Sequence, residues 1–108
     1  MSDLPEPPAT FQAFIERHPE LGQAWELIGR AGRSGPLDDE TVRLIKLGVA
    51  IGAMREGAVH ASVRKAAGLG IAPEAVEQVV AIAAGTIGLP GAVAAFSWVR
   101  ELLPNGEG

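Results

Sequence analysis

One of the two histidines in the chain lies at helical spacing from a carboxylate. His60 follows Glu56 by four residues and precedes Arg64 by four, so the three side chains share one face of a predicted helix. A carboxylate one turn from an imidazole can hold its tautomer and assist proton transfer. The same spacing also occurs in exposed charge stripes, which stabilise a helix by roughly 0.2–0.5 kcal/mol for each pair. The spacing alone therefore leaves an acid–base site and a solvated stripe both open.

Residues for other kinds of catalytic site are missing. The chain has no cysteine, which excludes a disulfide, a thiolate metal site and a thiol nucleophile. The glycines around residue 88 have no Lys-Ser or Lys-Thr beside them, so they form no phosphate-binding loop. One histidine and one glutamate are too few for a metal site unless symmetry-related copies supply the rest. We expect no metal and no cofactor, and we interpret His18, directly before Pro19, as a solvated turn residue.

Composition limits the class of partner. The 108 residues include 9 basic and 13 acidic side chains, a formal net charge of −4. This length suits a single domain, and this charge gives no attraction to nucleic acid or to anionic membranes. We therefore expect a protein or a small molecule as partner. Residues 1–8 are acidic and proline-rich where a signal peptide would be basic and then apolar, so we expect a cytoplasmic protein.

The first part of the chain is divided by prolines and glycines. We interpret residues 1–8, with three prolines, as a disordered arm, 9–103 as one helical domain and 104–108 as a frayed tail. A first helix is predicted over about 9–17. A second begins at Pro19 and ends near Ile28, before a glycine-punctuated loop over 29–37.

Four further helices follow, which gives six in all and no strand. Asp38 is the predicted N-cap of a helix that reaches about Met54, and the next helix covers about 56–67. Pro73 begins a fifth helix, which the Gly-Leu-Pro run at 88–90 separates from a last one. Residues 79–99 carry no charge and are long enough for a membrane span, but the break in their middle favours two buried helices. So much apolar surface exceeds what a small domain can cover, which predicts an oligomer.

Several short runs stand in a fixed order between Pro19 and Leu103. They are TVRLIKLGVA at 41–50, EGAVH at 56–60, RKA at 64–66, Gly70, PE at 73–74 and GLP at 88–90, followed by Ala94 and Ala95. In order and spacing they resemble the carboxymuconolactone decarboxylase family, which includes the alkylhydroperoxidase D-like proteins. The resemblance implies an all-α bundle that assembles as a homo-oligomer, commonly a trimer or a hexamer.

The resemblance also implies which branch of the family is closer. Thiol peroxidases of this family use Cys-x-x-Cys, followed after three more residues by histidine, with an upstream glutamate as proton relay. On this chain the histidine is His60, the cysteine positions hold Ala53 and Glu56, and the upstream acid falls near Arg43. The chain is therefore similar to the decarboxylase-type branch, in which glutamate replaces the second cysteine.

The leading hypothesis is a thiol-independent small-molecule site at a subunit interface. His60 would be the general acid or base, Glu56 its orienting partner, and Arg43 and Arg64 the substrate-binding residues. Such a lyase or isomerase could act on a carboxylated, lactone-like substrate, because an imidazole can deliver a proton to a developing enolate. A non-catalytic oligomeric binding or scaffold protein is the alternative from another class. Antioxidant peroxidase activity is a third hypothesis, inherited from the family alone, and whether the chain is an enzyme stays open.

Overall fold

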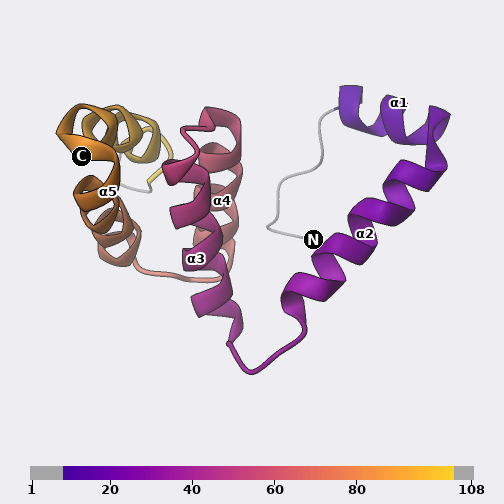
Figure 1. Ribbon diagram of the computed structural model, residues 1–108, viewed down its shortest axis with the longest axis horizontal. Coiled ribbons are helices and arrows are strands. Elements are labelled where there is room, and N and C mark those ends of the chain that lie inside the picture. The colour runs from indigo at the N-terminus through magenta and orange to yellow at the C-terminus, as the bar shows by residue number, and fades with distance from the viewer. Residues whose placement is uncertain (1–8, 104–108) are drawn as a thin grey trace.

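Every regular element in the described part of the chain, residues 9–103, is a helix. The computed structural model contains α1 (Ala9–Arg17), α2 (Pro19–Arg33), α3 (Asp39–Gly52), α4 (Glu56–Gly68) and α5 (Pro73–Arg100), shown in Figure 1. The all-α prediction is confirmed for these residues. The disordered arm predicted over 1–8 and the frayed tail predicted over 104–108 lie outside the described residues.

The start of α3 is set by an N-cap. The Asp38 carboxylate accepts a hydrogen bond of 2.8 Å from the backbone N–H of Thr41. This bond satisfies one of the amides that the first turn of a helix leaves without an internal partner. Asp39 and Glu40 occupy that first turn, where negative charge interacts favourably with the helix dipole. The predicted cap at Asp38 is confirmed.

The core lies between α3, α4 and α5, each of which packs against the other two. One face of α4 packs into this core, since Val59, Val63 and Ala66 are all buried. The largest fully buried side chains come from all three helices and are Leu47, Ile51, Val59, Val63, Val76 and Val99. This three-helix bundle fixes the position of α4, which carries the candidate histidine.

A break inside α5 separates the two helices predicted for this segment. Gly88 has φ 85° and ψ 161°, a conformation that glycine adopts because it has no Cβ. Pro90 lies just after the break, in the first turn of the second helical part. Backbone N–H groups in a first turn have no partner within the helix, so proline, which lacks an N–H, is tolerated there. Residues 9–103 thus contain five helices where six were predicted, because the last two form one element, α5, with the predicted break at Gly88. By length and composition α5 could cross a membrane, but its parts, 73–87 and 89–100, are each shorter than the roughly 20 residues of a span.

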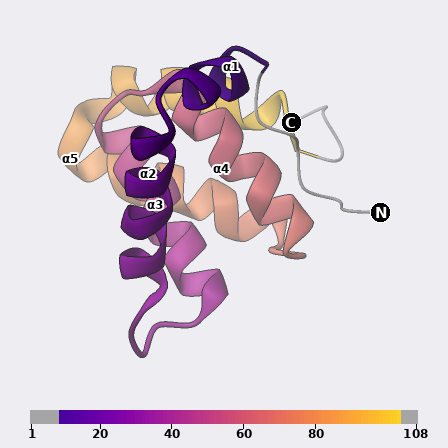
Figure 2. The same cartoon turned by 90° about the vertical axis from the view of Figure 1, so that its right-hand side faces the viewer.

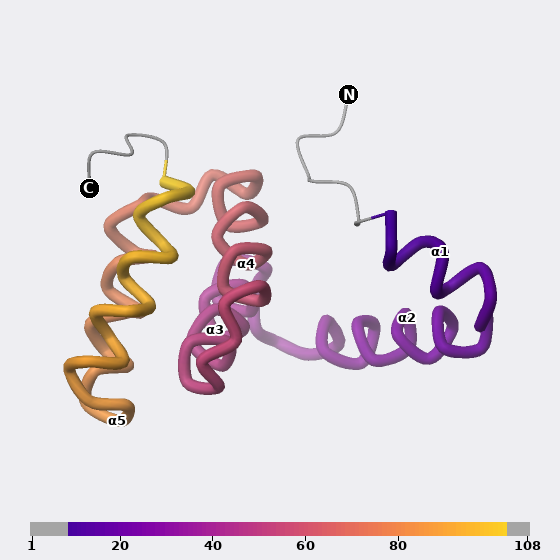
Figure 3. The backbone as a smooth tube through the Cα atoms, turned by 90° about the horizontal axis from the view of Figure 1, so that it is seen from above, coloured from indigo at the N-terminus to yellow at the C-terminus, as the bar shows by residue number. Residues whose placement is uncertain are grey.

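α1 and α2 form a helical arm that extends away from the bundle (Figure 1). In the view turned by 90° the arm lies in front of the bundle (Figure 2). Neither helix contains a buried residue. Residues 34–38 join the arm to α3, and the view from above shows how far the arm projects (Figure 3). The predicted loop over 29–37 is wrong for its first part, because α2 continues through Gly29 and Gly32 to Arg33. A glycine inside a helix costs only about 1 kcal/mol, so it does not have to end one.

Candidate functional site

A tight turn between α3 and α4 positions the acidic member of the site. Met54 occupies the left-handed region at φ 55°, and the Arg55 N–H donates to the Ala50 carbonyl at 3.0 Å. The chain therefore reverses within 53–55 and places Glu56 in the first turn of α4. A carboxylate is stabilised there by the helix dipole, and His60 follows one turn later on the same face.

The Nε2 atom of His60 lies between two carboxylates. It is 3.7 Å from Oε2 of Glu56 and 3.7 Å from Oε1 of Glu101, and the His60 side chain is 23% exposed. Both distances exceed the length of a direct hydrogen bond. Nε2 is buried and has no hydrogen-bond partner among the described residues. The imidazole thus lies beside two carboxylates, and its Nε2 atom makes no hydrogen bond to either of them.

Glu101 is a member of this site that sequence spacing does not reveal. It follows directly after α5, and only the packing of the bundle brings it to α4. The one signal in the sequence is its place in the charge pattern, because Arg100 and Glu101 are the first charged residues after Glu77. The position of this carboxylate at the end of a long uncharged segment is noticeable in the sequence, but the sequence does not indicate that it contacts His60.

The two predicted substrate-binding arginines lie apart. Arg43, on α3, is half-buried and donates from Nη1 to the Ser62 hydroxyl at 3.4 Å. Ser62 is two residues after His60, so the two side chains leave α4 on nearly opposite sides. Arg64, one turn beyond His60, is exposed and makes no hydrogen bond or ion pair within residues 9–103. The structure therefore brings His60 and Glu56 together and places Arg43 on another face.

Comparison with protein-family models decides the family. Residues 19–101 match the model of the carboxymuconolactone decarboxylase family, a range that runs from the start of α2 to the end of the site at Glu101. The chain belongs to the carboxymuconolactone decarboxylase family. The resemblance seen in the sequence is thereby confirmed. Comparisons with curated proteins and with solved structures find no match.

This carboxymuconolactone decarboxylase family member has no cysteine. Ala53 lies in the turn before α4 and Glu56 in its first turn, and neither side chain can supply a thiolate. The acid–base groups that the structure brings together here are one imidazole and two carboxylates. Within residues 9–103, no three His, Asp or Glu side chains are grouped so that they could hold a metal ion.

Three hollows in the described part of this family member's surface lie away from His60. A largely apolar groove of about 410 Å³ runs between α3 and α5, with Ile45, Gly48 and Ile82 in its walls. A second hollow of about 230 Å³ shares Gly48 and Ile82 with it, and a third of about 400 Å³ lies in the bend of the helical arm. None of these three is lined by the residues around His60.

Proposed function

We propose that His60 transfers a proton at a thiol-independent site for a carboxylated small molecule, in a lyase or isomerase reaction of the decarboxylase type. The observation that carries the proposal is the position of Nε2, which is buried, without a hydrogen-bond partner in the described chain and 3.7 Å from each of two carboxylates. A buried imidazole nitrogen normally has a hydrogen-bond partner, so a ligand that displaces the neighbouring side chains could supply the one that is missing here.

The proposed reaction needs only an acid and a means of placing the substrate. In a decarboxylation, the bond to the carboxylate carbon breaks, carbon dioxide leaves and the electron pair passes into an enolate. A protonated His60 then delivers its proton to carbon, and one proton from solvent restores the imidazolium. Glu56 and Glu101 each have an oxygen 3.7 Å from Nε2, where they can orient the ring. This sequence consumes one proton and releases one carbon dioxide without a cofactor.

We propose Arg64 as the main substrate-binding residue. It lies one turn from His60 on α4, is exposed and has no acidic partner among residues 9–103, so its guanidinium can pair with a substrate carboxylate. Arg43 makes its hydrogen bond to Ser62 on the other side of α4. We therefore propose that Arg43 also binds an anion, but at a distance from the reacting atoms.

We further propose that the protein is a homo-oligomer, a trimer or a hexamer. The radius of gyration is 14.8 Å, against roughly 13 Å for a compact chain of this length. Large apolar side chains remain exposed on both the helical arm and the bundle, and they include Phe14, Trp25, Ile28, Val49, Ile82 and Leu89. Apolar surface of this extent is typical of subunit interfaces. A second copy that covered it would also change the surroundings of the exposed carboxylates beside His60.

A non-catalytic oligomeric binding or scaffold protein is the second candidate. It is favoured by one observation, since the Glu56 and Glu101 side chains are 56% and 61% exposed and none of the three hollows described above reaches His60. On this account the three residues form a solvated cluster of charge.

An activity screen separates the two candidates. Purified protein is tested for carbon dioxide release from a panel of carboxylated lactones, and each substrate that reacts is repeated with His60→Gln. The loss of a general acid is expected to lower the rate by roughly a hundredfold or more. His18→Gln is the matched control, because His18 is exposed, between α1 and α2, and is expected to change nothing. Equal rates for the wild type and His60→Gln would contradict the proposal, and no reaction with any lactone would favour the scaffold.

A further inference from the structure

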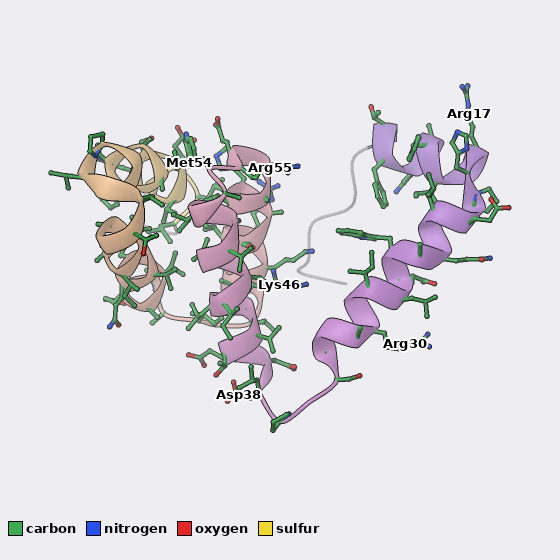
Figure 4. All side chains as sticks on the ribbon, viewed as in Figure 1. Arg17, Arg30, Asp38, Lys46, Met54 and Arg55 are labelled. Carbon is green, nitrogen blue, oxygen red and sulfur yellow. The ribbon has the colours of Figure 1, made fainter. Side chains whose placement is uncertain are left out.

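Three basic residues gather where α3 packs against α4. Arg43 and Lys46 lie one turn apart on α3, and Ser62 and Lys65 lie one turn apart on α4. The hydrogen bond of 3.4 Å from Arg43 to Ser62 joins the two helices at this point. Figure 4 shows Lys46 extending from α3 toward the side on which the helical arm lies. The four residues form what we call the α3/α4 basic cluster.

The basic cluster has no compensating negative charge in the described chain. Neither Arg43, Lys46 nor Lys65 has a carboxylate oxygen within 4.0 Å among residues 9–103. The Nε atom of Arg43 is buried and makes no hydrogen bond there. Ser62, at 5% exposure, is buried as well, and its oxygen accepts from Arg43. A buried cationic group normally has an anionic partner, because desolvation without one is costly.

The charged form of Lys65 is disfavoured by its two basic neighbours. Burial lowers the pKa of the Arg43 guanidinium below its ordinary value. Burial lowers the pKa of the Lys65 ammonium too, and repulsion from Arg43 and then from Lys46 lowers it further. Every contribution acts against the charged forms, so an anion at this place would relieve both the repulsion and the desolvation.

We propose that the α3/α4 basic cluster is a binding site for a small oxyanion, a carboxylate or a phosphate, separate from the His60 site. Arg43 supplies planar N–H donors, the Ser62 hydroxyl can donate its hydrogen to the same ion, and Lys46 and Lys65 add two positive charges. Arg43 is half-buried and Ser62 is buried, whereas Lys46 and Lys65 are exposed. Donors that are partly covered by the helices, with two exposed cations beside them, favour a small ion over the side chain of a second subunit.

Thermal unfolding of the full chain tests this site without an enzyme assay. Inorganic phosphate and, separately, succinate are titrated at constant ionic strength, with sodium chloride making up the difference. Specific binding raises the melting temperature with ligand concentration. A response to phosphate alone would assign a phosphate, and a response to succinate alone would assign a carboxylate. His60→Gln is expected to respond as the wild type does, which separates this site from the proposed reaction.

Three variants localise the effect. Arg43→Gln and Lys65→Gln are expected to weaken the apparent affinity by about tenfold or more, because each removes a charged contact to the ion. Arg17→Gln is the matched control: it removes the same charge from an exposed position at the end of α1, outside both proposed sites, and is expected to keep the wild-type response. Without added anion, Arg43→Gln is expected to melt at or above the wild-type temperature, since a half-buried cation without an anionic partner has been removed.

Two results would overturn the proposal. One is an equal response to both anions in the wild type, Lys65→Gln and Arg43→Gln, which would show that the ions act on the surface in general. The other is loss of the oligomer in Arg43→Gln and Lys65→Gln, with no anion response in the wild type. That result would assign the basic cluster to a subunit contact. Lys65 is exposed, so Lys65→Gln decides the question even where Arg43→Gln does not fold.

Discussion

The Nε2 atom of His60 is as close to Glu101, just after the last helix, as it is to Glu56 on its own helix, 3.7 Å in each case. A pair on one helix forms whenever that helix forms. The contact with Glu101 requires α4 and α5 to pack in this arrangement. The site therefore depends on the tertiary fold, and disturbance of α5 is expected to disturb the surroundings of the histidine.

The contact between Glu101 and His60 is testable by nuclear magnetic resonance. Because the chain has only two histidines, their imidazole nitrogen signals can be assigned with His60→Gln. At one fixed pH, Glu101→Gln is expected to shift the His60 signals and to leave those of His18 unchanged, since removal of a charge 3.7 Å from Nε2 changes the electric field at the ring. Unchanged His60 signals in Glu101→Gln would show that the carboxylate does not lie there in solution.

Leu47 is expected to be a main contributor to stability. Its side chain is fully buried between the three packed helices, and Leu47→Ala should lower the free energy of unfolding by about 2–5 kcal/mol. Leu37→Ala removes the same atoms from an exposed position in the loop before α3 and should cost roughly 0.5 kcal/mol. Chemical denaturation measures both, and equal costs would contradict the assignment of the core.

Trp25 is expected to support assembly. Its side chain is 62% exposed on a helix that contains no buried residue. Trp25→Asp should reduce the molar mass found by light scattering toward that of one chain, because a charge would be buried in the subunit contact. Gln12→Asp, on the exposed surface of α1, is the control and should leave the mass unchanged. A wild-type protein that is monomeric at micromolar concentration would refute the oligomer.

The cap at Asp38 predicts a dependence of stability on acid pH. Hydrogen bonds from Thr41, first from its side chain and then from its backbone, lower the pKa of Asp38 from its ordinary 3.8. The folded state therefore binds this proton less tightly than the unfolded state. The stability from the cap is complete well above pH 3.8 and is lost as pH falls through the lower, folded value.

Thermal melts across the acid range check the cap. Asp38→Ala should melt below the wild type at neutral pH, and the difference should shrink as the pH falls. Asp39→Asn removes the neighbouring charge and leaves the hydrogen bond of the cap intact. Its melting temperature should therefore change with pH more nearly as that of the wild type does. A constant difference between wild type and Asp38→Ala at every pH would contradict the role of the ionised carboxylate.

Local rules predicted much of the fold. The sequence marks the beginnings of three helices, by the cap at Asp38 and by the prolines that begin α2 and α5. The structure has a helix beginning at each of these places. The glycines were less reliable. Gly88 breaks α5 at a positive φ, whereas Gly29 and Gly32 lie inside α2. Sequence does not separate these cases, because a glycine permits a break without requiring one.

Only the part of the site formed by residues close together in the sequence could be predicted. Glu56 and His60 are four residues apart, so helical geometry alone brings them together. Glu101 and Ser62 were not found, because their contacts with His60 and Arg43 depend on how helices pack. Arg43 was placed in the substrate site through the family resemblance, but the structure directs it to the opposite side of α4 from His60.

Deuterium incorporation during turnover tests the central claim, that His60 delivers a proton to carbon. A carboxylated lactone that releases carbon dioxide is allowed to react in D₂O, and the product is examined by nuclear magnetic resonance. The account predicts one deuterium at the carbon that receives the proton, formed roughly a hundredfold or more slowly by His60→Gln and at the wild-type rate by His18→Gln. Equal rates of incorporation by the wild type and His60→Gln would contradict it.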